Sequence, residues 1–448
     1  MKKVLVVGGG AREHVLCDAV HRSQDASLFS VMKNVNPGIN QLAEDYKQIK
    51  ETDVEHVVDY AKEKHVDLVF IGPEAPLEQG LTNALQKKDI SVCAPTKEAA
   101  RIETDKEWMR DLLQKYQIDG QLKYQSFTDV DKAKQYIEQL KGNVVLKPVG
   151  LTGGKGVKVA GDHFTDLAGA LEYIDQIFEE KIGGKAKVVI EEKAEGEEFT
   201  VQGFTDGKTI KTLPAVQDHK RLQPGDNGPN TGGMGSYSNK DGLLPFLSQK
   251  DYDATVYILK EIITALSKED CPYVGPIYGQ FMLTSEGPKV IEINARFGDP
   301  EAMNVLPLLQ TDFVSLGEKM VNGKLETVDL TFDMKATVCK YVVPEGYGVK
   351  SVSGKKIQID VDRIENVGAR LFYASVNQDN DDVTTTSSRS LAVVGFANAL
   401  SDAEQLCEKA LTFVHSDHIY IRHDIGTKDL IQQRIDHMKT LRGVKKTV

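Results

Sequence analysis

A glycine-rich turn between two apolar runs is the first candidate for chemistry in this chain. The run GLTGGKG at residues 150–156 follows Val144–Pro148 and precedes Val157–Ala160. Alternating β-branched residues on both sides predict a β-hairpin, not the strand–loop–helix of a P-loop, and the Ser or Thr that a P-loop needs after Lys155 is missing. The free backbone N–H groups of such a turn suit an anion. A flap over nucleotide phosphates and a plain hairpin connection both fit this pattern.

A strand-like run further along carries oxygen-bearing side chains at alternate positions. In the run VIEIN at residues 290–294, Glu292 and Asn294 are two apart, so in a strand they face the same side. Such oxygens suit Mg²⁺ or Mn²⁺, and Gln280 on the preceding predicted strand adds a third oxygen if the two strands pair. A Glu–Asn pair on a solvated face is the alternative. The apolar neighbours favour a buried carboxylate that needs a cation.

Arg296 follows directly, where this strand should give way to a helix. Asp299 is predicted to cap that helix, with Pro300 in its first position and Glu301 in its first turn. An arginine beside a strand end, a helix start and a metal commonly binds carboxylate or phosphate through two hydrogen bonds. We therefore expect Arg296 to contact an anionic substrate group.

Two further segments are candidates for binding. Residues 188–199 read VVIEEKAEGEEF, an apolar strand entering an acidic turn, where backbone groups suit adenine and a carboxylate suits ribose, although charge runs are usually solvated surface. Asp218 and Lys220 open a glycine-rich stretch that extends to Asp241 and shows almost no apolar periodicity. This stretch is predicted to lack regular structure and to be functional or disordered, and its basic residues and backbone N–H groups suit an anion.

The first hundred residues alternate strand and helix, which is typical of a parallel, doubly wound Rossmann-type domain. The predicted strands are 4–7, 28–32, 68–71 and 91–93, and the predicted helices are 11–21, 54–64 and 77–88. The ligand crevice should lie at the carboxyl ends of the strands, beside Gly8–Gly10, Asn36–Gly38 and Gly72–Pro76. Glu13 stands in place of the third glycine of a dinucleotide fingerprint, so NAD is disfavoured, whereas a phosphate monoester fits the turn beside Arg12.

The remaining pattern predicts further mixed domains. A long helix is expected over 97–116, strands over 187–192, 199–204, 277–283 and 289–293, a helix over 251–266, and a strand-rich region after about residue 325 with a helix over 402–413. A chain of 448 residues has the length of about three domains.

Composition limits the classes of function. The chain is 40% hydrophobic and 27% charged, with a formal net charge of −11, which argues against a nucleic-acid partner. No apolar run approaches the roughly 20 residues of a membrane span, and the N-terminal apolar run is a strand too short for a signal sequence. Five scattered cysteines without a CxxC pair argue against disulfides and fit a reducing cytoplasm.

Together these motifs resemble the ATP-grasp ligases, and most closely the phosphoribosylamine–glycine ligase (glycinamide ribonucleotide synthetase) family. The matching segments, in family order over about residues 1–310, are GGGAREH, NPG, GPEAPL, KPVGLTGGKGVKVA, VIEE with GEEFT, DHKR, GPNTGGMGSYS and KVIEINARFGDPE. The last third matches more thinly, through RHDIG at 422–426. Departures at Val149, at Thr384–Arg389 and at Phe372–Ser375 suggest a divergent, archaeal-type branch.

The resemblance implies a multidomain α/β and α+β fold. It comprises a Rossmann-like pre-ATP-grasp domain over 1–104, a two-part ATP-grasp domain over 105–325 with a lid over about 120–193, and a small strand-rich C-terminal domain over 326–448. It also implies ATP-dependent joining of glycine to 5-phosphoribosylamine through glycyl phosphate, in purine synthesis. ATP and Mg²⁺ or Mn²⁺ are the implied cofactors, in a cytoplasmic monomer or homodimer.

The resemblance assigns site residues by motif. Catalytic roles fall to Arg296, Lys147 and Asp218. ATP would be held by Lys106, Lys147, Gly153, Gly154, Lys155, Gly156, Glu191, Glu192, Lys193, Ala194 and Glu198, and the metal by Gln280, Glu292 and Asn294. The substrates would contact Gly10, Arg12, Asn36, Gly38, Glu74, Pro76, Lys220 and Asp299.

Three alternatives compete with this interpretation. A formate-dependent transformylase or a carboxylase acting on a related purine intermediate would share the ATP-grasp site. A Rossmann oxidoreductase would bind a nicotinamide cofactor, which the altered fingerprint disfavours. A non-catalytic nucleotide-binding regulator would bind ATP without releasing ADP, and the Glu292–Asn294 pair with Lys106 and Lys147 argues against it.

Overall fold

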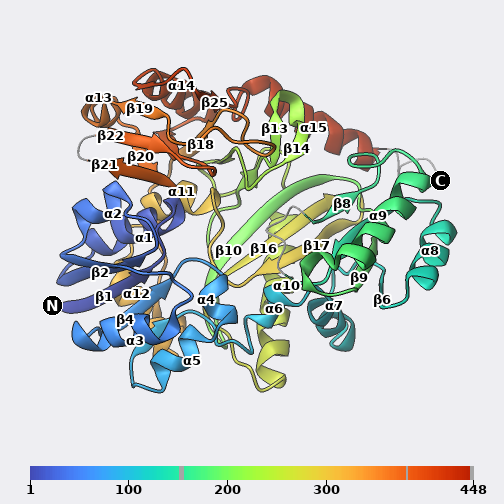
Figure 1. Ribbon diagram of the computed structural model, residues 1–448, viewed down its shortest axis with the longest axis horizontal. Helices are drawn as coiled ribbons and strands as arrows, with labels where there is room; N and C mark the ends of the chain where they lie inside the picture. Colours follow the sequence, from blue (N-terminus) through green and yellow to red (C-terminus); the bar gives the residue numbers. More distant parts are fainter. Residues whose placement is uncertain (151–155, 380–381, 444–448) are drawn as a thin grey trace.

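The computed structural model describes residues 1–150, 156–379 and 382–443. Figure 1 shows the N-terminal elements at one end of the molecule, a projecting group of helices and strands at the other, and the C-terminal elements along one side. Within these ranges no helix combines the length and apolar character that a membrane crossing requires. The predicted flap residues Gly153, Gly154 and Lys155 lie outside the described residues.

A five-stranded parallel sheet forms the N-terminal part, in the order β3-β2-β1-β4-β5. Its strands are β1 (Lys2–Val7), β2 (Ala26–Met32), β3 (Asp45–Gln48), β4 (Leu68–Ile71) and β5 (Ser91–Cys93). The predicted doubly wound arrangement is confirmed. Sequence analysis missed β3 because this edge strand reads DYKQ, without apolar alternation.

Five helices accompany this sheet: α1 (Ala11–His21), α2 (Pro37–Leu42), α3 (Val54–Glu63), α4 (Ala75–Glu78) and α5 (Leu81–Gln86). The single helix predicted over 77–88 is wrong, because Gly80 adopts φ 82° between α4 and α5, a conformation that glycine tolerates best. The helix predicted over 97–116 also divides, into α6 (Arg101–Thr104) and α7 (Lys106–Lys115). Asp105 separates them and its carboxylate caps α7 by accepting from the Trp108 N–H.

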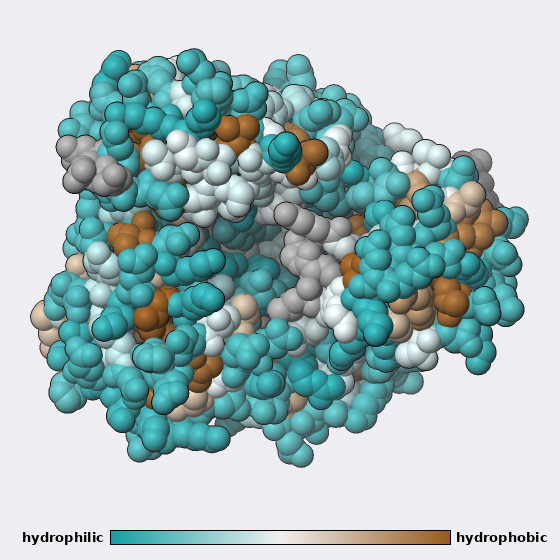
Figure 2. All heavy atoms as spheres, in the orientation of Figure 1, coloured by the Kyte–Doolittle hydropathy of each residue, from teal (hydrophilic) through white to brown (hydrophobic). Residues whose placement is uncertain are grey.

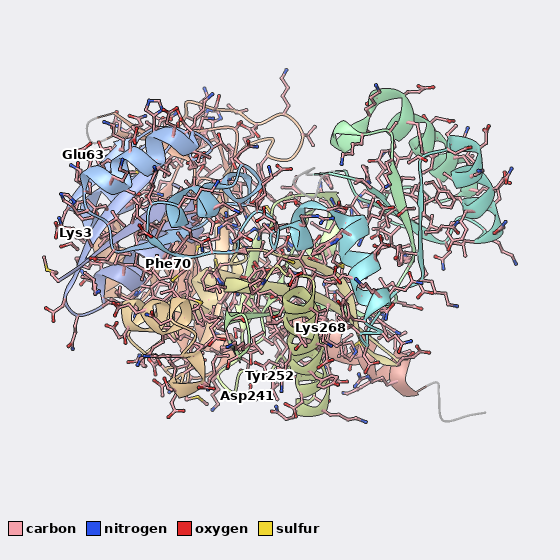
Figure 3. The ribbon with its side chains drawn as sticks, turned by 90° about the horizontal axis from the view of Figure 1, so that it is seen from below. Lys3, Glu63, Phe70, Asp241, Tyr252 and Lys268 are labelled. Carbon is pink, nitrogen blue, oxygen red and sulfur yellow. The ribbon has the colours of Figure 1, made fainter. Side chains whose placement is uncertain are left out.

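A lid, defined here as residues 124–192, has its own four-stranded sheet in the order β6-β9-β7-β8. The predicted hairpin is confirmed, because Val145 pairs with Val159 in antiparallel strands. A separate apolar core lies under the lid's helices, and the view from below shows these helices standing away from the rest of the molecule (Figure 3). The lid contains β6 (Tyr124–Phe127), α8 (Val130–Gln139), β7 (Val144–Pro148), β8 (Lys158–Val159), α9 (Leu167–Glu180) and β9 (Val188–Glu192).

The central sheet is antiparallel, in the order β11-β10-β16-β17. Its strands are β10 (Glu197–Asp206), β11 (Ile210–Thr212), β16 (Val274–Thr284) and β17 (Gly287–Asn294), and α10 (Gln249–Lys268) packs beside it, where Tyr252 donates to the Leu213 carbonyl at 2.8 Å (Figure 3). The predicted pairing of the two site-bearing strands is confirmed, because Gln280 lies directly opposite Glu292.

The helix after β17 begins later than predicted. It is α11 (Glu301–Val305), and its N-cap is Pro300, without a side-chain capping bond. The capping role predicted for Asp299 is therefore wrong. Its carboxylate instead accepts from the Tyr341 hydroxyl at 2.5 Å and pairs with Arg389 at 3.1 Å. The helix α12 (Phe313–Val321) follows.

The C-terminal sheet takes strands from two distant parts of the chain. Its order is β12-β15-β18-β23-β20, and β25 also pairs with β18. β18 (Ala336–Pro344), β20 (Arg370–Tyr373), β23 (Leu391–Ala397) and β25 (Ile419–Ile421) come from the C-terminal part, whereas β12 (Gln217–Asp218) and β15 (Gly235–Ser238) come from the glycine-rich stretch. That stretch also holds the hairpin of β13 (Arg221–Gln223) and β14 (Asn227–Asn230). The prediction that 218–241 lacks regular structure is wrong, because short glycine-rich strands show no apolar periodicity.

A second small sheet and three helices complete this part. The sheet order is β21-β22-β19-β24, with β19 (Lys356–Ile359), β21 (Val376–Asp379), β22 (Asp382–Thr385) and β24 (Val414–His415). The helices are α13 (Val361–Asn366), α14 (Leu400–Leu411) and α15 (Lys428–Gly443).

Candidate active site

The positive charges of three lysines from separate elements act on the carboxylate of Glu292. Burial alone would raise the pKa of Glu292, but Lys220, Lys147, a hydrogen bond from Asn294 and Lys106 lower it to about 2. The lysines come from the loop after β12, from β7 in the lid and from the start of α7. One carboxylate among three ammonium groups leaves excess positive charge, so this cluster suits a polyanion.

Lys147 is held in place by a buried ion-pair network. Its Nζ lies 2.8 Å from Oε2 of Glu191 and donates to the Ile291 carbonyl at 3.0 Å. Arg110 on α7 donates to both oxygens of the same carboxylate at 2.8 Å. Glu191 therefore links Lys147 of β7 to Arg110 of α7, because its carboxylate pairs with both side chains.

Lys106 and Lys220 each contact a different wall of the site. Lys106 Nζ donates to the Gly150 carbonyl at 2.8 Å, directly before the glycine-rich turn. Lys220 Nζ donates to Oε1 of Gln280 at 2.7 Å, and the amide of Gln280 donates to Glu198 at 2.6 Å. The loop after β12 is thereby linked to both neighbouring strands of the central sheet.

The oxygen-bearing side chains fit a divalent cation. Gln280 lies opposite Glu292 across β16 and β17, and Asn294 Nδ2 donates to Oε1 of Glu292 at 3.1 Å. The three predicted ligands therefore lie together, and their carboxylate and amide oxygens are of the kind that Mg²⁺ and Mn²⁺ prefer. The low pKa keeps Glu292 ionised at neutral pH.

Arg296 lies between two carboxylates. Its guanidinium is 3.5 Å from Glu74, at the start of α4, and 3.1 Å from Glu103 on α6. Burial raises the pKa of Glu103 to about 6, although Arg296 lowers it. For Glu74, burial would raise the pKa, but Arg296 and Arg12 together bring it below its usual value. The N-terminal part and the central sheet thus meet at this arginine.

The N-terminal glycine turn is organised around Glu13. Glu13 accepts from the Gly10 N–H at 2.7 Å and from Arg12 Nε at 2.8 Å. Arg12 also donates to the Phe297 carbonyl at 3.2 Å, so it reaches the segment after β17. A Cβ at Gly72 would lie 2.0 Å from Oε1 of Glu13, so this carboxylate fills the space that a third glycine leaves open in a dinucleotide site.

Asn36 and Gly38 lie where the N-terminal part meets the C-terminal sheet. The side-chain oxygen Oδ1 of Asn36 caps α2 by accepting from the Gly38 N–H at 3.0 Å, and Nδ2 of Asn36 donates to the Tyr373 carbonyl at 2.7 Å. Gly38 faces the ring of His14, which accepts from the Tyr373 N–H at 2.9 Å. Both predicted substrate residues therefore also build a domain contact, and Pro76 lies buried in the first turn of α4.

Two carboxylates lie close together beside Lys220. Burial, with Glu301 nearby, raises the pKa of Asp218 well above its usual value, and burial also raises the pKa of Glu301. Glu301 accepts from the Tyr278 hydroxyl at 2.8 Å. Oδ1 of Asp218 is buried and has no hydrogen-bond partner among the described residues. Such a pair suits a cationic group.

The remaining predicted nucleotide residues line the connection between lid and central sheet. Glu192 accepts from the Lys123 N–H at 2.9 Å, and Lys193 Nζ donates to the Ala160 carbonyl at 2.6 Å. Ala194 is half-buried. The Gly156 carbonyl accepts from the Tyr173 hydroxyl at 2.6 Å.

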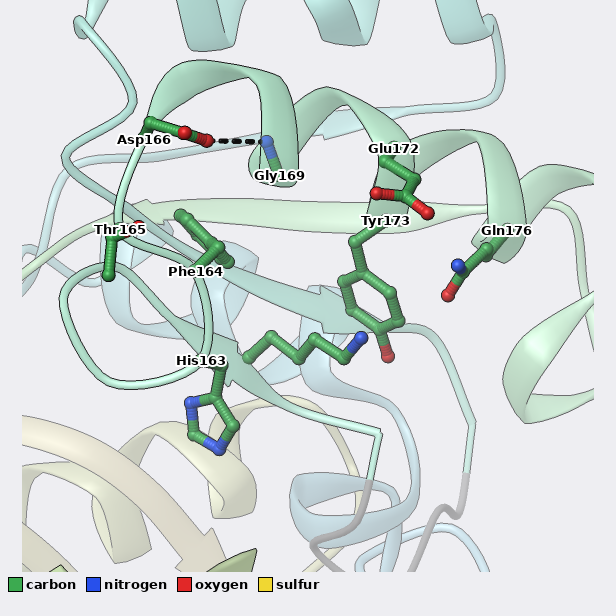
Figure 4. A pocket seen from close by; sticks show the side chains of 9 residues that line it. His163, Phe164, Thr165, Asp166, Gly169, Glu172, Tyr173 and Gln176 are labelled. Atoms are coloured by element: carbon green, nitrogen blue, oxygen red, sulfur yellow. Dashed lines mark hydrogen bonds between the residues drawn. The ribbon is translucent and has the colours of Figure 1, made fainter.

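The molecule is hollowed between the lid and the rest of the chain, and hydrophilic residues cover much of the visible floor (Figure 2). Besides a cavity of about 590 Å³ beside β19 and α13, two cavities lie away from the predicted site residues. One, of about 260 Å³, lies within the lid, where Lys158 Nζ sits 3.7 Å from the centre of the Tyr173 ring (Figure 4). The other, of about 950 Å³, lies between the β13–β14 hairpin and the segments around Tyr347 and Tyr420.

Several residues that shape the site were not among the predicted site residues: Glu103, Arg110, Tyr278 and Arg389, together with Glu301, which was predicted only to lie in the first turn of a helix. Arg110 carried a signal in the sequence, because it stands next to Met109 and three residues before Leu113, at the apolar positions of the predicted helix. The structure places it on the buried face of α7, where it is 1% exposed. The others reach the site only through contacts between distant segments.

Three family models match consecutive parts of this chain. They are the N domain of phosphoribosylglycinamide synthetase over residues 2–103, its ATP-grasp (A) domain over 104–302 and its C domain over 337–428. Together they extend over most of the chain.

Curated relatives match almost the whole length. A phosphoribosylamine–glycine ligase from Methanothermobacter thermautotrophicus is 51% identical over 441 residues, covering 98% of this chain and 100% of the relative. One from Methanocaldococcus jannaschii is 49% identical, also over 98% of this chain and 100% of the relative.

Solved structures share the fold. The crystal structure of phosphoribosylamine–glycine ligase from Thermotoga maritima has a TM-score of 0.80 at 24% identity, covering 94% of this chain and 99% of that chain. A biotin carboxylase complex from Campylobacter jejuni has a TM-score of 0.72 at 14% identity, covering 98% of each chain. Likeness at this identity shows the fold alone, whereas identity near one half over the full length shows the family. This chain therefore belongs to the phosphoribosylamine–glycine ligase family.

Proposed function

We propose that this chain joins the carboxyl group of glycine to the amino group of 5-phosphoribosylamine. ATP is cleaved to ADP and phosphate, and glycinamide ribonucleotide is the product of this step of purine synthesis. One observation carries the proposal: the charges of three lysines act on Glu292. Glu292 itself lies opposite Gln280 and near Arg296. This arrangement suits phosphoryl transfer, which depends on positioning and charge stabilisation.

The first step makes the carboxyl group reactive. A glycine carboxylate oxygen attacks the γ-phosphorus of ATP, the bond to the bridging oxygen breaks, and ADP leaves with glycyl phosphate formed. Lys106 and Lys147 hold the phosphates, and Arg296 contacts the transferring phosphoryl group or the glycine carboxylate. The ion pair with Glu191 supports this role of Lys147, because it fixes the ammonium group at the end of β7.

The second step forms the amide. The amine of phosphoribosylamine attacks the carbonyl carbon, phosphate leaves, and the nitrogen loses a proton. We assign the glycine ammonium group to Asp218 and Glu301, because Oδ1 of Asp218 is buried without a hydrogen-bond partner among the described residues and Glu301 lies nearby. Asp218 and Lys220 also help to place the acceptor, and Asp299 contacts a substrate.

Gln280, Glu292 and Asn294 are the proposed ligands of Mg²⁺ or Mn²⁺. When bound, the cation would neutralise charge on the phosphate oxygens. The register of β16 and β17 supports this set, because it brings the three side chains to one place. Asn294 then also orients the carboxylate through its hydrogen bond to Glu292.

ATP occupies the space between the lid and the central sheet in this proposal. Backbone groups of Glu191, Glu192, Lys193 and Ala194 line adenine, and Glu198 holds ribose. Gly153, Gly154, Lys155 and Gly156 cover the phosphates. The half-exposed carboxylate of Glu198 beside Gln280 supports the ribose role.

5-Phosphoribosylamine occupies the crevice of the N-terminal sheet. The residues proposed to shape it are Gly10, Arg12, Asn36, Gly38, Glu74 and Pro76. Arg12 and the N-terminus of α1 suit the phosphate group. The contact between Glu74 and Arg296 supports the placement, because it brings this crevice next to the phosphoryl-transfer site.

We further propose the division of the chain at residues 104 and 325, with a subdomain of about 120–193 that contains the lid. A cytoplasmic location is part of the same proposal, supported by five free, buried cysteines. The same proposal includes a monomer or homodimer as the assembly. It also limits the partners to small molecules and excludes nucleic acid.

The test is an ADP-release assay with freshly generated phosphoribosylamine. Each substrate is omitted in turn, and formate or bicarbonate replaces glycine in parallel reactions. We expect ADP release that requires glycine, phosphoribosylamine and a divalent cation together. Equal release with formate or bicarbonate would favour a transformylase or carboxylase, and absence of release despite ATP binding would favour a regulator.

A further inference from the structure

Arg389, from the C-terminal part of the chain, binds the loop at Gly232 and Gly233 and also the proposed substrate residue Asp299. Its NH1 donates to the Gly232 carbonyl at 2.6 Å, the Gly233 carbonyl at 3.1 Å and the Asp299 carbonyl at 3.1 Å. Its NH2 lies 3.1 Å from the Asp299 carboxylate. The guanidinium also stacks 4.3 Å from the centre of the Tyr341 ring.

Each contacted segment lies against one of the two close carboxylates. A Cβ at Gly233 would lie 2.8 Å from Oδ1 of Asp218, so the loop that Arg389 holds packs directly on that carboxylate. Asp299 is two residues before Glu301, at the start of α11. The separation between Asp218 and Glu301 therefore depends on how the loop at 232–233 sits against the turn at 299–301.

Neither segment is tied to the other by regular structure at this point. Gly233 has φ 106°, and Asp299 lacks the capping bond predicted for it. Arg389 contacts both, and Tyr341 donates to the Asp299 carboxylate from the same side. A planar guanidinium can meet several carbonyls and stack on a ring at once, whereas a lysine ammonium cannot stack in this way.

We propose that Arg389 is a positioning residue, which sets the spacing of Asp218 and Glu301 and so controls the use of the amino-acid substrate. This inference rests on the proposed function, which assigns the glycine ammonium group to that pair. It predicts a larger defect for glycine than for ATP, because Lys147 and the lid are held by other contacts, among them the pairing of Glu191 with Arg110 and Lys147.

The experiment compares the full-length wild type with Arg389→Ala and Arg389→Lys. ADP release is measured while glycine and ATP are varied separately. We expect kcat/KM for glycine to fall by about 100-fold in Arg389→Ala, the scale of a misplacement of about 1 Å, with KM for ATP within about threefold of the wild type. Added guanidinium chloride at millimolar concentration should restore part of the glycine-dependent rate of Arg389→Ala. Arg389→Lys should show the same selective defect to a lesser degree.

The matched control is Arg370→Ala. Arg370 also belongs to the C-terminal sheet and pairs with Asp18 of α1 at 2.9 Å, with a side chain that is 40% exposed. This variant loses a contact between domains without touching the loop or the turn, so both substrates should keep their KM within about twofold, with no response to guanidinium.

Several outcomes would overturn the inference. Arg389→Ala with the kinetics of Arg370→Ala would do so, and so would equal losses for glycine and ATP. If Arg389→Ala fails to fold, as judged by circular dichroism, Arg389→Lys decides: a wild-type KM for glycine overturns the inference, and a selective rise supports it. If the wild type shows no glycine-dependent ADP release, the proposed function is wrong and this inference falls with it. That failure can be told apart from failure of the Arg389 inference alone, because it is seen in the wild type without any variant.

Discussion

Lys147 and Glu191 form an ion pair with an Nζ–Oε2 distance of 2.8 Å, and their side chains are 6% and 1% exposed. Arg110 shares the same carboxylate. A single carboxylate thus balances two buried cations at the edge of the proposed phosphate site. This arrangement holds a lysine in a fixed position before any nucleotide arrives.

Replacing Glu191 tests how much this network stabilises the fold. In Glu191→Gln two buried cations lose their counter-charge, and breaking a buried pair in this way costs about 3–5 kcal/mol. We expect the free energy of unfolding, measured with urea, to fall by that amount and KM for ATP to rise. The control is Glu318→Gln, whose partner Lys2 is 50% exposed; it should cost no more than about 1 kcal/mol. Equal losses in the free energy of unfolding of Glu191→Gln and Glu318→Gln would contradict the stabilising role of the buried Glu191 network.

Replacing Glu292 tests the metal site. Glu292→Gln keeps the shape of the side chain and removes the charged ligand, so we expect turnover to fall at least about 100-fold, with a higher Mg²⁺ or Mn²⁺ concentration for half-maximal rate. Circular dichroism should show a cooperative melting transition as in the wild type. Glu55→Gln, on the exposed side of α3, is the control and should have wild-type turnover. Near-normal activity of Glu292→Gln at saturating Mg²⁺ would refute the metal role.

The buried position of His14 leads us to predict that the free energy of unfolding falls in acid. Burial lowers its pKa in the folded protein from 6.5 to about 4, so the unfolded chain binds a proton more readily between these values. Stability contributed by neutral His14 is complete above about pH 6.5 and is lost as the pH falls towards 4. The loss is about 3 kcal/mol.

The measurement for His14 is urea unfolding at several pH values over that window. His14→Asn keeps an acceptor for the Tyr373 N–H and does not titrate, so its stability should fall less steeply on acidification. His415→Asn, at an exposed position, should keep the wild-type slope. Parallel pH profiles for wild type and His14→Asn would show that this histidine is not the cause.

Gly38→Ala tests the close approach of α2 to α1. A Cβ at this position would lie 1.9 Å from Cε1 and 2.2 Å from Nε2 of His14, so the ring must move. Overpacking of this kind costs about 1–3 kcal/mol, which melting and urea curves would detect. At Gly443 in α15 a Cβ would meet open space, so Gly443→Ala should be neutral or stabilising by up to about 1 kcal/mol.

A double variant tests whether the His14 ring causes the loss of stability expected in Gly38→Ala. In His14→Ala with Gly38→Ala the ring is absent, so the second substitution should add little to the cost of the first. Additive losses would mean that the His14 ring is not what excludes a side chain at Gly38.

The sequence by itself determined the local elements and much of the candidate site. Period-2 runs located the strands that carry Lys147, Glu292 and Asn294, because strand faces follow directly from residue spacing. Alternation of strand and helix predicted the parallel N-terminal sheet. The same reasoning failed at Asp45–Gln48 and within 218–241, because edge and glycine-rich strands are stabilised by backbone pairing, which leaves no apolar pattern.

Only the tertiary structure decided which charges meet. Arg110 joins Glu191 from 81 positions away and Arg389 reaches Asp299 from 90 positions away. The glycine-rich stretch joins the C-terminal sheet through β15 and β18, so the carboxylate pair of Asp218 and Glu301 is assembled by three distant segments. Spacing along the chain determines which residues are neighbours within one element. Contacts between elements depend instead on how their buried faces pack, so the distances between their side chains could not be read from residue spacing.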